Sequence, residues 1–118
     1  MIKSILLAVD GSEHALKAAA TAGDLARCLG ARLSLVTVYD PLPPYLQEPG
    51  LQQAMDERFL QAEQVLHQAL QYIGSTPEPV DCRQLEGPVA EAVLHAVQAQ
   101  PVDLIVMGAR GLGRLQGM

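Results

Sequence analysis

The stretch SILLAVDGS, residues 4–12, decides the fold, because five apolar residues follow one serine and end in Asp-Gly-Ser. A continuous apolar run of this length, closed by turn residues, is typical of a strand buried on both faces of a parallel sheet. Apolar positions then recur every three or four residues, which predicts a helix over about seventeen residues. Ser12 is a suitable N-cap for this helix, and Gly30 is a suitable left-handed stop. A second buried strand, RLSLVTVY at residues 32–39, follows.

The rest of the chain continues the same alternation. Residues 41–50 hold four prolines, which predict a loop, and residues 51–73 return to helical spacing. Residues 80–85 alternate apolar with polar side chains, as expected of a half-exposed strand near a sheet edge. A third helix opening at Gly87-Pro88 and a fourth buried strand at residues 102–107 complete the order β-α-β-α-β-α-β. Helices between strands demand parallel, right-handed crossovers, so we predict an α/β fold: an open, mostly parallel twisted sheet, Rossmann-like, with helices on both faces.

Composition limits the classes of partner. The chain has 118 residues, 49% of them hydrophobic and 18% charged, which predicts a single folded domain over residues 1–118. Eight Lys and Arg residues and a net charge of -5 argue against nucleic acid as a partner. The first apolar run is too short for a signal peptide or a membrane span, so we expect no membrane partner and a cytoplasmic location. Cys28 and Cys82 form no zinc or disulfide pattern, and we expect both to pack as small apolar residues.

Two features fall at strand ends where a ligand is expected. Asp10 closes the first strand, and the glycine loop GARGLGR, residues 108–114, follows the fourth. In open parallel sheets, ligands bind outside the carboxyl ends of the strands, where the strand order reverses. If the first two crossovers run one way and the fourth strand returns to the other side of the first, Asp10 and this loop become neighbours.

The glycine loop suits an anionic ligand. Gly108, Gly111 and Gly113 let the main chain approach a phosphate and turn its N–H groups inward, and Arg110 and Arg114 add positive charge. A glycine-rich turn also occurs without any ligand, and an Asp before Gly-Ser is often a turn residue or a cap. Each feature alone therefore leaves both interpretations open, and their shared location favours binding.

Three segments, AVDGS (8–12), VTVYD (36–40) and VDLIVMGARG (102–111), resemble the universal stress protein family, and the resemblance covers the whole chain. The family's ATP signature is a Gly, two residues, a second Gly, nine residues, then Gly followed by Ser or Thr. Gly108 and Gly111 match the first two glycines. The final pair would fall at positions 121 and 122, so the resemblance implies that a fourth helix and a fifth strand, missing from this chain, follow Met118.

The resemblance implies a stress-response module that binds ATP between Asp10 and the glycine loop, with main-chain groups of Val38 reading the adenine edge. Asp10 would accept a hydrogen bond from a ribose hydroxyl or help hold Mg²⁺. The nucleotide would act mostly as a bound regulator, with slow hydrolysis at best, in a homodimer. The residues expected at the nucleotide are Ala8, Val9, Asp10, Val38, Met107, Gly108, Arg110, Gly111, Gly113 and Arg114.

Two other functions compete with ATP binding by a regulatory module. An adenylate-forming or ATP-pyrophosphatase enzyme shares this type of sheet, but its turn after the first strand resembles SGGxDS, and the turn at residues 10–12 holds one glycine. A nucleotide-free dimerisation module of the same fold stays open. Hydrolase, metalloprotease and P-loop functions lack their motifs, since no Ser/His/Asp set, HExxH or GxxxxGK[ST] occurs.

Overall fold

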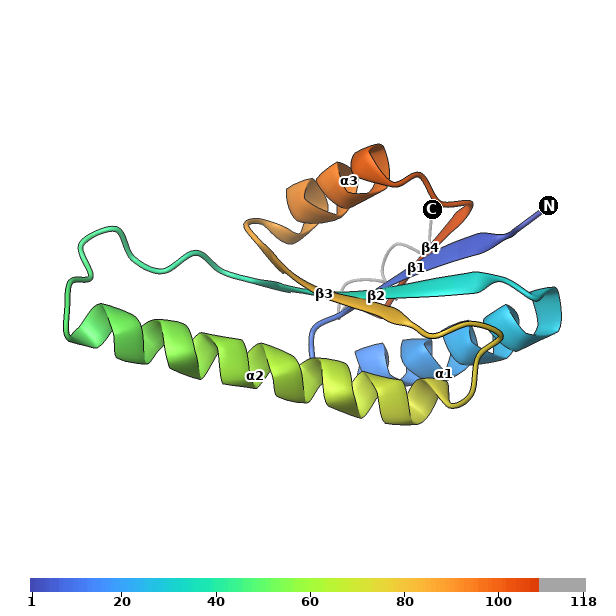
Figure 1. The fold of residues 1–118 in the computed structure, drawn as a ribbon, viewed down its shortest axis with the longest axis horizontal. Helices are drawn as coiled ribbons and strands as arrows, with labels where there is room; N and C mark the ends of the chain where they lie inside the picture. The colour runs from blue at the N-terminus through green and yellow to red at the C-terminus, as the bar shows by residue number, and fades with distance from the viewer. Residues whose placement is uncertain (109–118) are drawn as a thin grey trace.

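A computed structural model describes residues 1–108 and shows one parallel sheet with helices on both of its faces (Figure 1). The elements are β1 (Ser4–Val9), α1 (Glu13–Leu29), β2 (Arg32–Tyr39), α2 (Gly50–Ile73), β3 (Asp81–Glu86), α3 (Val89–Ala99) and β4 (Leu104–Met107). The predicted α/β alternation is therefore confirmed. Predictions that concern residues 109–118 lie outside the described residues.

The strand order is β3-β2-β1-β4, and each neighbouring pair is parallel. The first two crossovers run one way and β4 returns to the other side of β1, as the site prediction required. α1 and α2 cover one face of the sheet and α3 covers the other (Figure 1). Because Ala8 pairs with Met107, the residues that follow β1 and β4 leave the sheet side by side.

The α1 helix forms where its caps were predicted. Ser12 Oγ accepts a hydrogen bond from Ala15 N at 3.2 Å, and Gly30 ends the helix at φ 65°. A stripe of alanines and one glycine lets α1 pack closely on α2: a Cβ on Gly23 would overlap the Ile73 carbonyl. Arg27 Nη1 donates to that same carbonyl at 2.7 Å and so supplies a partner for the end of α2.

Each face of the sheet carries its own core. Between the sheet and the helices α1 and α2, strand residues such as Ile5, Leu7 and Leu35 are fully buried. On the opposite face, Val93 of α3 packs with Leu6 and with the other residues of a smaller cluster. Within residues 1–108, no helix is long and apolar enough to cross a bilayer.

Two expectations about burial, for β4 and for the cysteines, are wrong. β4 was expected to be a buried strand, but Ile105 is 43% exposed, because β4 forms an edge of the described sheet. Met55 and Phe59 continue the apolar spacing of α2 yet are exposed, since this 24-residue helix is about 36 Å long and outruns the sheet (Figure 1). Cys28 and Cys82 were expected to pack internally, and both are exposed. The edge position expected for the third strand is confirmed.

Candidate functional site

A small hollow at the carboxyl ends of β1, β2 and β4 collects the expected residues that the structure describes. It is lined by Ala8, Val9, Asp10, Val38, Val89, Met107 and Gly108. The expected residues Arg110, Gly111, Gly113 and Arg114 lie outside the described residues. Val89 was predicted only as part of the apolar side of the third helix. Its place in the hollow depends on how α3 sits over the sheet, which the spacing of apolar residues does not specify.

Asp10 is both a turn residue and an available acceptor. Its Oδ1 accepts hydrogen bonds from Ser12 N at 2.9 Å and from Ser12 Oγ at 2.5 Å, which is the geometry of an Asx turn. Oδ2 has no hydrogen-bond partner among residues 1–108, and the side chain is exposed. The turn thus fixes the carboxylate through Oδ1, and none of residues 1–108 uses Oδ2.

Ser12 connects the two halves of the predicted site. Its Oγ lies 3.3 Å from the Gly108 carbonyl oxygen, 2.5 Å from Asp10 Oδ1, and accepts from Ala15 N. A hydroxyl has one proton to donate, and the shorter distance assigns it to Asp10. The sequence indicated Ser12 only as a helix cap. Its contact with Gly108 arises because β4 pairs beside β1, so no local signal reports it.

Gly108 has a packing reason to be glycine. It is buried, and a Cβ there would overlap the His14 carbonyl oxygen and lie 2.6 Å from Ala15 Cα and 2.7 Å from Ala18 Cβ. The side of Gly108 that a side chain would occupy is therefore filled by α1. This reason stands beside the expected one, which is close approach of the main chain to a phosphate.

The main chain of Val38 faces the hollow by strand alternation. The Tyr39 carbonyl accepts from Gly87 N at 3.1 Å, so the main-chain groups of Tyr39 face β3. Successive residues of a strand alternate in direction, so those of Val38 face the side of β1, next to the point where that strand ends at Val9.

Thr37 is a residue of the site that the sequence analysis missed. Its side chain is only 4% exposed, and its Oγ1 donates to the Val9 carbonyl at 2.8 Å. This bond holds the last residue of β1 against β2 directly before Asp10. A threonine inside a β-branched strand looks like any other strand former, which is why the pattern gave no indication of it.

Arg58 of α2 contacts the last residues of β2 and β3, beside the site. Its guanidinium lies 4.1 Å from the centre of the Tyr39 ring, and its Nη1 is 3.2 Å from Glu86 Oε2. The ends of β2 and β3 are thereby tied to α2, although the sequence indicated only a solvated helix face here. Within residues 1–108, no group of three His, Cys, Asp or Glu side chains gathers closely enough to hold a metal ion.

The hollow is small for a ligand site. Its volume is about 50 Å³, whereas drug-sized ligands occupy pockets of roughly 300–1,000 Å³. The described residues therefore form a floor on which part of a ligand can rest, and they do not enclose one.

Comparison with known proteins identifies the family. The model of the universal stress protein family matches residues 1–118. The chain belongs to the universal stress protein family. A Thermus aquaticus relative, the universal stress protein in the QAH/OAS sulfhydrylase 3' region, is 48% identical over 113 residues, which cover 96% of this chain and 81% of that protein. The resemblance inferred from the three strand-end motifs is thus confirmed.

Solved structures of the family share the fold of this universal stress protein chain. The universal stress protein UspA from Lactobacillus plantarum is 26% identical and has a TM-score of 0.75, with 92% of this chain and 80% of that chain covered. A universal stress protein solved in complex with cAMP is 23% identical and has a TM-score of 0.68, covering 99% of this chain and 86% of that one. At this level of identity, the second likeness shows the α/β fold alone.

Proposed function

We propose that this chain binds an adenine nucleotide, ATP, across the carboxyl ends of β1 and β4. The observation that carries the proposal is the meeting of Asp10 and Gly108 at one hollow, at the ends of the neighbouring strands β1 and β4, where Ser12 Oγ bonds to Asp10 and lies 3.3 Å from the Gly108 carbonyl oxygen. The chain leaves β1 toward β2 and later returns from β3 to β4 on the other side of β1, so the strand order reverses here, which is the position at which open α/β sheets bind their ligands. That a family member of the same fold was solved in complex with cAMP is consistent with this choice of ligand class.

Each residue of the hollow has a proposed role. Asp10 Oδ2 accepts from a ribose hydroxyl or helps hold Mg²⁺, and the main chain of Val38 contacts the adenine edge. Ala8, Val9 and Met107 supply the apolar floor. The sequence assigns the phosphates to Gly108, Arg110, Gly111, Gly113 and Arg114. A nucleotide lying across the floor, with its phosphates beyond it, is compatible with the small volume of the hollow.

The proposed nucleotide is a regulator of a stress-response module, with slow hydrolysis at best. A dedicated general base would have to stand beside the attacking water. Asp10 is the one ionisable side chain among the described residues of the hollow, and the binding proposal already uses it. We further propose that the intact protein is a cytoplasmic homodimer without a nucleic-acid or membrane partner. A nucleotide-free dimerisation module is the alternative.

Asp10→Asn tests the binding role separately from the turn. The amide oxygen of asparagine can still accept from Ser12, so the turn is retained while the negative charge and the second acceptor are lost. We expect ATP affinity, measured by titration calorimetry with Mg²⁺, to fall by about tenfold, since one charge-assisted hydrogen bond is removed. Asp56→Asn, the same change on the exposed side of α2, is the matched control and should leave affinity unchanged.

The proposal as a whole is tested by acid extraction of purified protein, chromatography of the extract, and thermal shift with millimolar Mg-ATP. Absence of both a bound nucleotide and a thermal shift would establish the nucleotide-free alternative. Gly111→Val is expected to abolish binding while the domain stays folded, and an unchanged affinity in that variant would remove the glycine loop from the site. Release of product from ATP at about 1 per second or faster would favour the competing function, an adenylate-forming or ATP-pyrophosphatase enzyme.

A further inference from the structure

The face of the sheet that α3 covers is polar at the amino ends of the strands. In β2, Arg32 and Ser34 alternate with the buried residues Leu33 and Leu35, so both polar side chains point to the α3 side. In β3, Arg83 points the same way. Further along, this face is apolar and packs against α3. Polar residues at positions that elsewhere form a core are informative about function.

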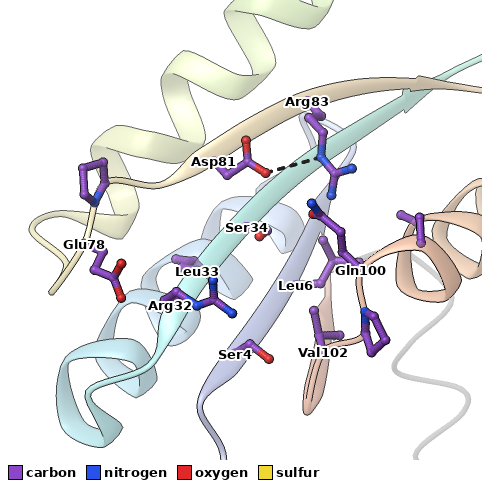
Figure 2. Close-up of a pocket in the computed structure, with 14 residues that line it drawn as sticks. Ser4, Leu6, Arg32, Leu33, Ser34, Glu78, Asp81, Arg83, Gln100 and Val102 are labelled. Atoms are coloured by element: carbon purple, nitrogen blue, oxygen red, sulfur yellow. Dashed lines mark ion pairs between the residues drawn. The ribbon is translucent and has the colours of Figure 1, made fainter.

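These residues line a groove at the amino ends of the strands (Figure 2), whereas Asp10 follows the carboxyl end of β1. Its volume is about 550 Å³, which lies within the roughly 300–1,000 Å³ of small-molecule sites. The floor consists of strand residues, and the last turn of α3 forms one wall with Gln100. The groove is therefore large enough for a ligand, in contrast to the hollow at Asp10.

The two arginines of the groove have unused hydrogen-bonding capacity. Arg83 Nε lies 3.5 Å from Asp81 Oδ2, close enough for an ion pair, yet this buried nitrogen has no hydrogen-bond acceptor among the described residues. Arg32 is exposed and makes no ion pair with any of residues 1–108. Arg83 Nε is itself covered, so a ligand in the groove would meet the terminal nitrogens of this guanidinium, a group suited to binding carboxylate or phosphate.

The spacing of the arginines indicates the shape of the ligand. Arg83 pairs in register with Val36, four residues beyond Arg32 on the neighbouring strand. At about 3.3 Å per residue, the two backbones are roughly 13 Å apart along the strands. Both guanidinium groups extend into the groove between them (Figure 2). Two separated cations fit a ligand that carries one acidic group at each end.

We propose that this groove binds a small dianion with a carboxylate or phosphate group at each end, held by Arg32 and Arg83. The hydroxyl of Ser34 and the side-chain amide of Gln100 supply neutral hydrogen bonds between the two ends. Glu78 and Asp81 also line the groove and balance the two positive charges, so the proposed binding rests on direct contacts with the two guanidinium groups and not on a net positive field. The site is separate from the proposed nucleotide site and does not depend on it.

The test is titration of the 118-residue chain, followed by NMR of the backbone amides, with three probes: glutarate, inorganic pyrophosphate and butyrate. We expect glutarate or pyrophosphate to shift the amides of residues 32–34 and 81–83, and the monoanion butyrate to bind at least about tenfold more weakly. A response to only one of the two dianions identifies the acidic group as carboxylate or phosphate.

Arg32→Gln should weaken binding of the responsive dianion by about tenfold or more, because it removes one charged partner at an exposed position that the fold does not need. Lys17→Gln removes the same charge from the exposed side of α1, on the other face of the sheet, and is the matched control. Failure of both dianions to bind up to about 10 mM would overturn the proposal. So would equal affinity for butyrate, or unchanged affinity in Arg32→Gln. Asp10→Asn should leave this binding intact, which separates it from the nucleotide site.

Discussion

Gly108→Ala adds one methyl group where α1 leaves no room for it. The new Cβ would overlap the His14 carbonyl and stand 2.6 Å from Ala15 Cα. Both atoms are main chain, so no rotamer change relieves the overlap, and α1 or β4 must shift. Overpacking of this kind costs about 1–3 kcal/mol. Alanine also restricts the unfolded chain, which returns about 0.4–1 kcal/mol, so we expect a net loss of about 1–2 kcal/mol.

The loss is measured as a change in Tm. At about 2.1 cal/mol/K per residue, the unfolding entropy of 118 residues is about 0.25 kcal/mol/K, so the expected decrease is about 4–8 °C by calorimetry. Gly50→Ala is the matched control: its nearest non-local atom is Leu46 Cδ1 at 3.8 Å, and it lies at the start of α2, so Tm should hold or rise. If Gly108→Ala unfolds at the wild-type temperature, α1 does not confine this residue and the packing reason for its glycine is wrong.

Two further variants test side-chain hydrogen bonds at opposite ends of the sheet. Thr37→Val removes the buried hydrogen bond to the Val9 carbonyl and should lower the free energy of unfolding in urea by about 1–2 kcal/mol; Thr37→Ser keeps the hydroxyl, and equal losses in both would show that the bond contributes nothing. Hydrogen bonds from the main chain of Lys3, and then of Ser4, lower the pKa of the Asp103 carboxyl below its ordinary 3.8. A carboxyl whose pKa is lower in the folded than in the unfolded state stabilises the folded protein at pH values above its unfolded-state pKa. This stabilisation is lost as the pH falls through the folded-state pKa. Asp103→Asn should therefore have a lower Tm than wild type at pH 7, with the gap closing below about pH 4; a gap that is constant with pH would contradict this.

The sequence predicts most of the fold because its signals are local. Strand runs such as residues 4–9, the Ser12 cap and the Gly30 stop each lie within one element, and all three are confirmed. Parallel pairing followed from the alternation of strands and helices, whereas the strand order entered only as a condition, which the structure meets. The errors concern properties that depend on neighbours: the exposure of Ile105 depends on β4 being an edge, and that of Phe59 depends on the length of α2 relative to the sheet.

The residues of the candidate site were likewise predicted where their signal is local and missed where it depends on distant contacts. Asp10 and Gly108 follow strand ends, so the sequence placed both at one edge of the sheet, and the pairing of β4 beside β1 makes them neighbours. Thr37 and Arg58 act through contacts between elements distant along the chain, and their residue types are ordinary in a strand and on a helix face. The groove between Arg32 and Arg83 could not be found from spacing, because it depends on which part of the sheet α3 leaves uncovered.

The contacts of Ser12 provide a built-in spectroscopic reporter. Its oxygen accepts the Ala15 amide proton while its own proton goes to Asp10. A ligand that draws the Asp10 carboxylate away, or moves the Gly108 carbonyl, changes the acceptor strength of that oxygen. The resonance and hydrogen-exchange rate of one amide, that of Ala15, should therefore register occupancy at this edge of the sheet without any attached label.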